Sequence, residues 1–114
     1  MIRQRAIIVL YAAVLGCFAS ASTQACDVKL SVQNKSSATI VAVEYRSSGS
    51  ETWSSNLISG SVGPHGDQVV AWSGDGDLDL GIRFTDATAP RVVPARDICS
   101  KSELIANPGG IVIR

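Results

Sequence analysis

The sequence is poor in the residue types that build most catalytic and nucleic-acid-binding sites. Its 114 residues include one histidine and three cysteines, too few to supply the His and Cys ligands of a zinc site. It has no CxxC spacing and no Gly-x-Ser-x-Gly nucleophile turn. No run of Lys or Arg provides the basic patch that binds nucleic acid. We therefore expect no enzyme activity, no cofactor and no nucleic-acid partner.

Helical periodicity is also missing beyond residue 25, where apolar residues do not recur at helical spacing for more than one turn. Short runs of alternating apolar and polar residues occur instead, separated by Gly, Pro, Ser and Asn. We expect strands at 28–32, 39–46, 56–58, 68–72, 78–84, 91–93 and 111–113, a strand-like 98–99, and one helical turn at 102–106. This pattern predicts an all-β fold, a small antiparallel β-sandwich or Greek-key barrel of about six to eight short strands.

Two of these segments have a defined inward face. In 78–84, the side chains of Leu78, Leu80, Ile82 and Phe84 are expected to point into the core. In 39–46, alternation places Val41, Val43 and Tyr45 inside, with Glu44 and Arg46 facing water.

The N-terminus has the features of a secretory signal. Arg3 and Arg5 precede an apolar run at 6–18, and small residues follow to Ala25. The apolar run is about a dozen residues, shorter than the roughly 20 that span a bilayer, so we expect no membrane span. We predict a signal at 1–25 that is removed and a single all-β domain at 26–114, located in the periplasm or outside the cell.

Two alternatives for the processing of this signal stay open. Small residues allow cleavage before Ser22 or, with a poorer fit, before Cys26. The segment 14–17 also resembles a lipobox, in which Cys17 would carry a lipid anchor.

Cys26 and Cys99 lie near opposite ends of the predicted domain. In an oxidising compartment they are expected to form one structural disulfide. Such a bridge closes most of the domain into a single loop, which the chain-entropy model values at roughly 4 kcal/mol.

Acidic residues form the one pattern that resembles a metal site. Asp75, Asp77 and Asp79 alternate, and Asp86 falls eleven residues after Asp75, which resembles the ligand spacing of a calcium loop. The sixth position is Leu80 where such loops require glycine. The ordinary interpretation is the solvent face of a strand, and calcium remains a weak alternative.

Two further segments are candidates for binding. Trp53 lies in a serine- and glycine-rich loop that leads to Asn56. Its ring is either an anchor for a partner or a plug for the open end of the sandwich. His65 lies in the turn 63–66, which we expect to be exposed and at the same end as Trp53.

Several segments together resemble a loose group of small exported bacterial proteins with no assigned activity. They are a Val-Glu-Tyr-Arg strand, the serine loop before Trp53, the 63–66 turn, the strand at 79–86 and the closing Asp97-Ile98-Cys99. The resemblance implies a compact all-β module and supplies no catalytic residue. Many members of the group carry a cysteine just before the Asp-Leu-Arg-Phe-like strand, where this chain has Gly76 or Asp77. The resemblance then implies that Cys26 replaces that cysteine.

These observations favour an exported, non-catalytic β-sandwich module that binds a protein or envelope component through loops at one end. Loops on a rigid β scaffold are common binding surfaces. A periplasmic inhibitor of a secreted hydrolase and a calcium-stabilised structural protein are the alternatives.

Overall fold

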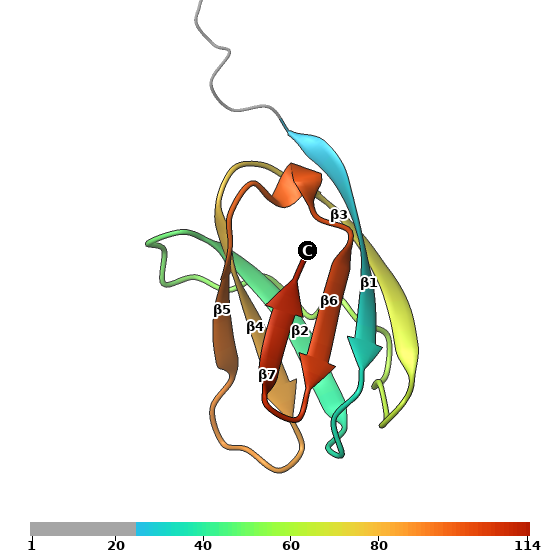
Figure 1. The fold of residues 1–114 in the computed structure, drawn as a ribbon. Coiled ribbons are helices and arrows are strands. Elements are labelled where there is room, and N and C mark those ends of the chain that lie inside the picture. The colour runs from blue at the N-terminus through green and yellow to red at the C-terminus, as the bar shows by residue number, and fades with distance from the viewer. Residues whose placement is uncertain (1–24) are drawn as a thin grey trace, which may run out of the picture.

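Two β-sheets pack face to face in the computed structural model, which describes residues 25–114 (Figure 1). The strands are β1 (Cys26–Asn34), β2 (Ile40–Ser47), β3 (Asp67–Gly74), β4 (Leu78–Phe84), β5 (Arg91–Ala95), β6 (Glu103–Asn107) and β7 (Gly110–Ile113). The four-stranded sheet has the order β3-β1-β6-β7, and the three-stranded sheet has the order β2-β4-β5. All pairs are antiparallel except β1 with β6, which are parallel. The predicted all-β sandwich is confirmed.

The core lies between the sheets and is built by the alternation that the sequence shows most clearly. In β4 the even-numbered side chains from Leu78 to Phe84 are buried, as predicted. In β1 Val28, Leu30 and Val32 face them from the other sheet. β1 and β4 therefore each present one apolar face to the opposite sheet and a more polar face outward.

The inward face of β2 differs from the prediction at its start. Ile40 and Val43 are fully buried, whereas Val41 is 37% exposed. The register between β2 and β4 shifts between Ile40 and Ala42, where β2 contains an extra residue. Such a bulge changes which side chains point inward, because strand side chains alternate with a period of two. The prediction that Val41 faces the core is therefore wrong.

The C-terminal segment also differs from the prediction. Ile98-Cys99 belongs to a short 3-10 turn, η2 (Ile98–Ser100), and is not a strand. Residues 103–107, expected to be partly helical, form the central strand β6, with Leu104 and Ala106 fully buried. The parallel pairing of β6 with β1 fixes this conformation, and no local pattern reports a partner about 70 residues away in the sequence.

The predicted disulfide is present and joins Cys26 at the start of β1 to Cys99 in η2. A disulfide of this kind indicates an oxidising compartment. Within residues 25–114 no helix has the length and apolar character needed to cross a bilayer. The predicted signal and the lipid anchor at Cys17 lie outside the described residues. The same holds for the cleavage site before Ser22, and the site before Cys26 lies at their start.

Candidate binding face around Trp53

Trp53 lies on the outer face of the three-stranded sheet. A Cβ added to Gly81 would lie 3.0 Å from both Cη2 and Cζ3 of the indole. Leu80 and Ile82, on either side of Gly81 in β4, point into the core, so Gly81 points away from it. The indole therefore packs against the outside of the sandwich, and its predicted role as an end plug is wrong.

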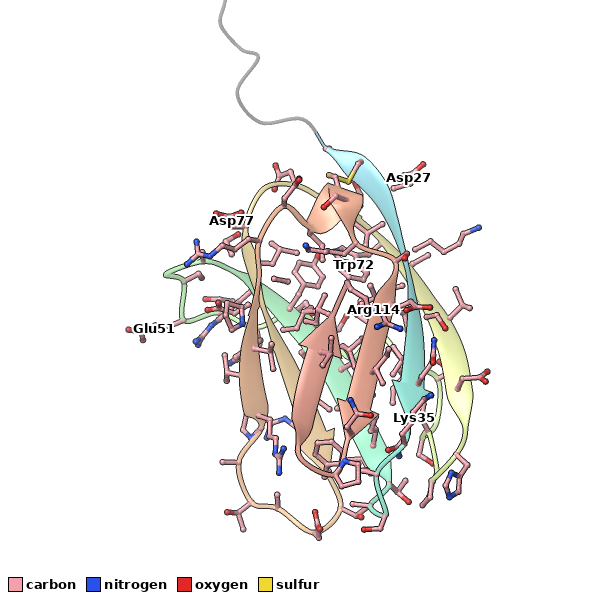
Figure 2. The ribbon with its side chains drawn as sticks, in the orientation of Figure 1. Asp27, Lys35, Glu51, Trp72, Asp77 and Arg114 are labelled. Atoms are coloured by element: carbon pink, nitrogen blue, oxygen red, sulfur yellow. A yellow bond between two sulfur atoms is a disulfide. The ribbon has the colours of Figure 1, made fainter. Side chains whose placement is uncertain are left out.

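The aromatic pair that does fill the inside of the sandwich is Tyr45 with Trp72. Their ring centroids are 5.3 Å apart and their planes are stacked at 16°. Figure 2 shows Trp72 in the interior, toward the end that carries the disulfide. The indole Nε1 of Trp72 is buried without a hydrogen-bond partner among the described residues.

Hydrogen bonds to β2 hold the loop that carries Trp53. Ser54 donates its N–H to the carbonyl of Tyr45 (2.8 Å), and its Oγ accepts the N–H of Tyr45 (3.0 Å). Asn56 Oδ1 accepts the N–H of Val43 (2.9 Å), and Leu57 donates to the carbonyl of Val43 (2.8 Å). This segment replaces a neighbouring strand at the edge of β2. Asn56 therefore positions the loop, because its side-chain amide is bonded to β2. The predicted strand at 56–58 is wrong, since these residues have no strand conformation.

Two pairs of charged side chains join β2 to β4 near the indole, and one of them contacts its ring. The Arg46 guanidinium lies 4.3 Å from the centroid of the Trp53 ring, and Arg46 Nε donates to Asp79 Oδ2 at 3.0 Å. Arg83 Nε donates to Glu44 Oε1 at 3.3 Å. In the strand register, Asp79 and Arg83 lie two residues before and after Gly81. The Arg46–Asp79 pair therefore lies on one side of the position covered by the indole and Arg83 on the other, while Glu44 lies directly opposite Gly81.

An exposed apolar residue completes this surface on β5. Val92 pairs with Gly81 in the strand register and is 46% exposed. We call this surface the Trp53 face; its residues are Glu44, Arg46, Trp53, Asp79, Gly81, Arg83 and Val92. It combines an indole, an aliphatic side chain and four charged side chains that are already paired.

His65 lies at the other end of the sandwich from the start of the Trp53 loop. Its N–H donates to the carbonyl of Asn34 at 2.7 Å, and it lines a cavity of about 350 Å³ together with Lys35. The Trp53 loop begins beside Asp77, where the N–H of Ser48 donates to the Asp77 carbonyl. Figure 2 shows Asp77 and Lys35 at opposite ends of the molecule. Within residues 25–114 no hydrogen bond or ring contact joins His65 to Trp53 or Asn56, and the grouping of the three residues in one binding site stays a prediction.

Asn34 organises the end that carries His65, a role that the sequence analysis missed. Its side chain is 1% exposed, and Nδ2 donates to the carbonyls of Ala38 (2.7 Å) and Val62 (2.9 Å). Its Oδ1 accepts from the N–H and the hydroxyl of Ser36. Every polar atom of this buried amide is thus used to hold two loops together. An isolated Asn before a Lys-Ser-Ser turn gives no sequence signal for this arrangement.

The four aspartates of the possible calcium loop do not converge. Asp79 is paired with Arg46, while Asp77 accepts the N–H of Asp97 and lies 3.7 Å from Arg96. Asp86 lines a different cavity, of about 180 Å³, beyond the end of β4. Within residues 25–114 no group of three or more His, Cys, Asp or Glu side chains is placed to hold a metal, Asp75 included.

Comparisons with known proteins give no assignment. No protein-family model matches the chain, and neither a curated protein nor a solved structure is significantly similar to it. Function is therefore inferred from the geometry of the Trp53 face.

Proposed function

We propose that this protein is an exported, non-catalytic β-sandwich module that binds a protein or envelope component through the Trp53 face. The observation that carries this proposal is the position of Trp53, which is held on the outer surface of the β2-β4-β5 sheet by Gly81 and Arg46. The recognition surface is then the broad face of a sheet together with one loop, in place of the loops at one end that the sequence suggested.

The chemistry of the face fits recognition of a protein surface. Trp and Arg are the residue types that contribute most to binding energy at protein interfaces, mainly where they are packed and pre-ordered. Here the loop is fixed to β2 by hydrogen bonds of Ser54 and Asn56, and the indole is fixed by contact with Gly81. The loop is already ordered in the folded protein. Binding therefore loses less conformational entropy than it would with a flexible loop.

The paired charges support specificity at the rim of such an interface. Each pair places a positive and a negative side chain next to each other on the neighbouring strands β2 and β4. The pairs are Arg46 with Asp79 and Arg83 with Glu44. Partly exposed pairs of this kind contribute little to stability, on the order of 0–1 kcal/mol. They set which partner orientation is electrostatically acceptable.

Export is part of the proposal and has two supports. The charged, apolar and small-residue order at the N-terminus is that of a secretory signal. The Cys26–Cys99 disulfide is the kind of bond that persists in oxidising compartments.

A photo-crosslinking amino acid at position 92 tests the proposal in cells that produce the protein. Val92 is exposed and pairs with Gly81, so its probe lies beside the indole. We expect a discrete crosslinked species that is lost when Trp53→Ala is added. The matched control carries the same probe at Val112, which is 43% exposed on the other sheet, and should not give this species.

Two outcomes would overturn the proposal. One is the absence of any adduct at position 92, and the other is an adduct that Trp53→Ala leaves unchanged. Thermal melting of Trp53→Ala is measured in parallel, so that a loss of the adduct can be separated from a loss of fold.

A further inference from the structure

The outer edge of β3 is the long sheet edge that the described chain leaves open. Residues 54–62 cover the edge of β2 through backbone and side-chain hydrogen bonds. The edge strand β5 is five residues long and contains Pro94, which has no N–H to offer. The edge strand β7 has only four residues. β3 has eight, contains no Lys, Arg or Pro, and runs along β1 without a register shift.

The register identifies which backbone groups of β3 face outward. The N–H of Ser31 donates to the carbonyl of Ser102, on the β6 side of β1, so the hydrogen-bonding groups of Ser31 point away from β3. Ser31 pairs with Val69, which in an antiparallel ladder must then point away from β1. Because the direction of the backbone groups alternates along a strand, the N–H and C=O groups that point away from β1 belong to Asp67, Val69, Ala71 and Ser73. The side chains of these four residues are also exposed.

Such an edge is a template for a further strand. An uncovered edge normally carries a Lys, a Pro, a bulge or an inward charge that blocks pairing with another chain. β3 has none of these protections. The other edge strands are protected, because β5 and β7 are short and β2 is covered by residues 54–62. It also presents Val69, the most exposed large apolar side chain of the described residues, at 60%.

We propose that two copies of this chain associate through their β3 edges, antiparallel about a two-fold axis at Val70. In this register Val69 of each copy faces Ala71 of the other, and Asp67 faces Ser73. All four outward residues of each copy then exchange hydrogen bonds with the second copy, and the two four-stranded sheets become one continuous sheet.

Three features of β3 favour a second copy as the occupant. The register keeps exposed side chains opposite exposed side chains, since paired residues of antiparallel strands share a face. The one charged residue of the strand, Asp67, meets a serine hydroxyl and not a second carboxylate. Val69 and Ala71 of both copies form a small apolar cluster. The most exposed valine of each copy is therefore removed from water when the dimer forms.

Val69→Lys tests the proposal by sedimentation equilibrium of the purified chain with its disulfide intact. The wild-type protein is expected to reach twice the monomer mass as its concentration rises. One new charge per copy at the edge should raise the dissociation constant by about tenfold or more. Because Val69 is exposed, the fold should tolerate the lysine. Val112→Lys is the matched control at the opposite edge of the same sheet and should leave the dimer intact.

Amide hydrogen exchange provides a second readout that reports the register. The backbone N–H groups of Val69, Ala71 and Ser73 should exchange more slowly as the dimer forms, whereas those of β7 should not change. Ala71→Pro removes one of these outward N–H groups without removing a bond to β1, and it should abolish the dimer while the circular dichroism spectrum is kept.

Three results would overturn the proposal. They are a wild-type protein that stays monomeric at every concentration, a dimer that survives Val69→Lys, and slowed exchange at β7 in place of β3. Protection of the β3 amides only by an added extended peptide would likewise exclude the second copy as the occupant.

Discussion

Trp53 occupies the space that a side chain at position 81 would need. The contact is close enough, at 3.0 Å to two atoms of the indole, that the ring and a Cβ at Gly81 cannot both stay in place. The backbone of Gly81 is not in the left-handed region, so the absence of a side chain serves the indole and not the strand conformation. The Trp53 face therefore depends on a glycine in the middle of β4.

Gly81→Ala should displace the indole and destabilise the protein. The clash falls in the range of overpacking substitutions, about 1–3 kcal/mol. Chemical denaturation measures the stability, and tryptophan fluorescence reports the change in the surroundings of Trp53. Gly63→Ala is the matched control, because nothing lies within 4 Å of a Cβ at Gly63. Equal effects of the two substitutions would contradict the contact.

Replacing both cysteines with serine should lower the free energy of unfolding substantially. The bridge joins residues that are 73 positions apart, and a closed loop of this length contributes roughly 4 kcal/mol in the chain-entropy model. Urea titrations of the oxidised protein and of the Cys26→Ser/Cys99→Ser variant measure the difference. A change below about 1 kcal/mol would mean that the disulfide does little to limit the unfolded ensemble.

Asn34→Ala should be among the most damaging single substitutions in the molecule. It removes the hydrogen bonds from Asn34 Nδ2 to the carbonyls of Ala38 and Val62, although the Val62 carbonyl keeps the N–H of Ile40. It also frees the loop that Ser36 ties to Asn34 Oδ1. We expect a loss of about 2–4 kcal/mol, since the four hydrogen bonds of the Asn34 amide are lost together and each contributes about 0.5–1.5 kcal/mol. Ser37→Ala, in the same loop, is the control and should have little effect. Comparable midpoints of denaturation for the two variants would contradict this role.

Trp72→Phe should leave stability unchanged within about 1 kcal/mol, because it removes a buried N–H that has no partner within residues 25–114 and keeps an aromatic ring against Tyr45. Trp72→Ala should cost about 3 kcal/mol, because it removes the stacked ring as well. Thermal unfolding of both variants separates the two contributions. A phenylalanine variant as unstable as the alanine variant would contradict the absence of a partner for the indole N–H within residues 25–114.

Much of the fold could be predicted because several strands bury only one face. The alternation in 28–32 and 78–84 encodes both the strand and its inward side, and the structure confirms both. Leu78 to Phe84 give this signal most clearly, since the outward positions include Asp79, Gly81 and Arg83. The disulfide was predictable for a different reason, because the predicted export signal implied an oxidising compartment and left two cysteines with no other evident role.

The errors arise where contacts distant in sequence decide the conformation. β6 is buried on both sides of the strand, so its side chains show no alternation, and its partner β1 lies at the other end of the chain. Val41 is turned outward by a single extra residue in β2, a change that no apolar pattern records. The positions of Trp53 and His65 depend on how irregular loops return to the strands, and the loop composition does not determine this.

The pairing of β1 with β6 has a consequence for when the molecule can form. β1 lies between β3 and β6, so its second neighbour is supplied only when residues 103–107 are present. A chain still emerging from the ribosome cannot complete this sheet until residues 103–107 have been released. Folding of such a non-local topology is intrinsically slow, and during that interval β1 has one side available to chaperones and proteases.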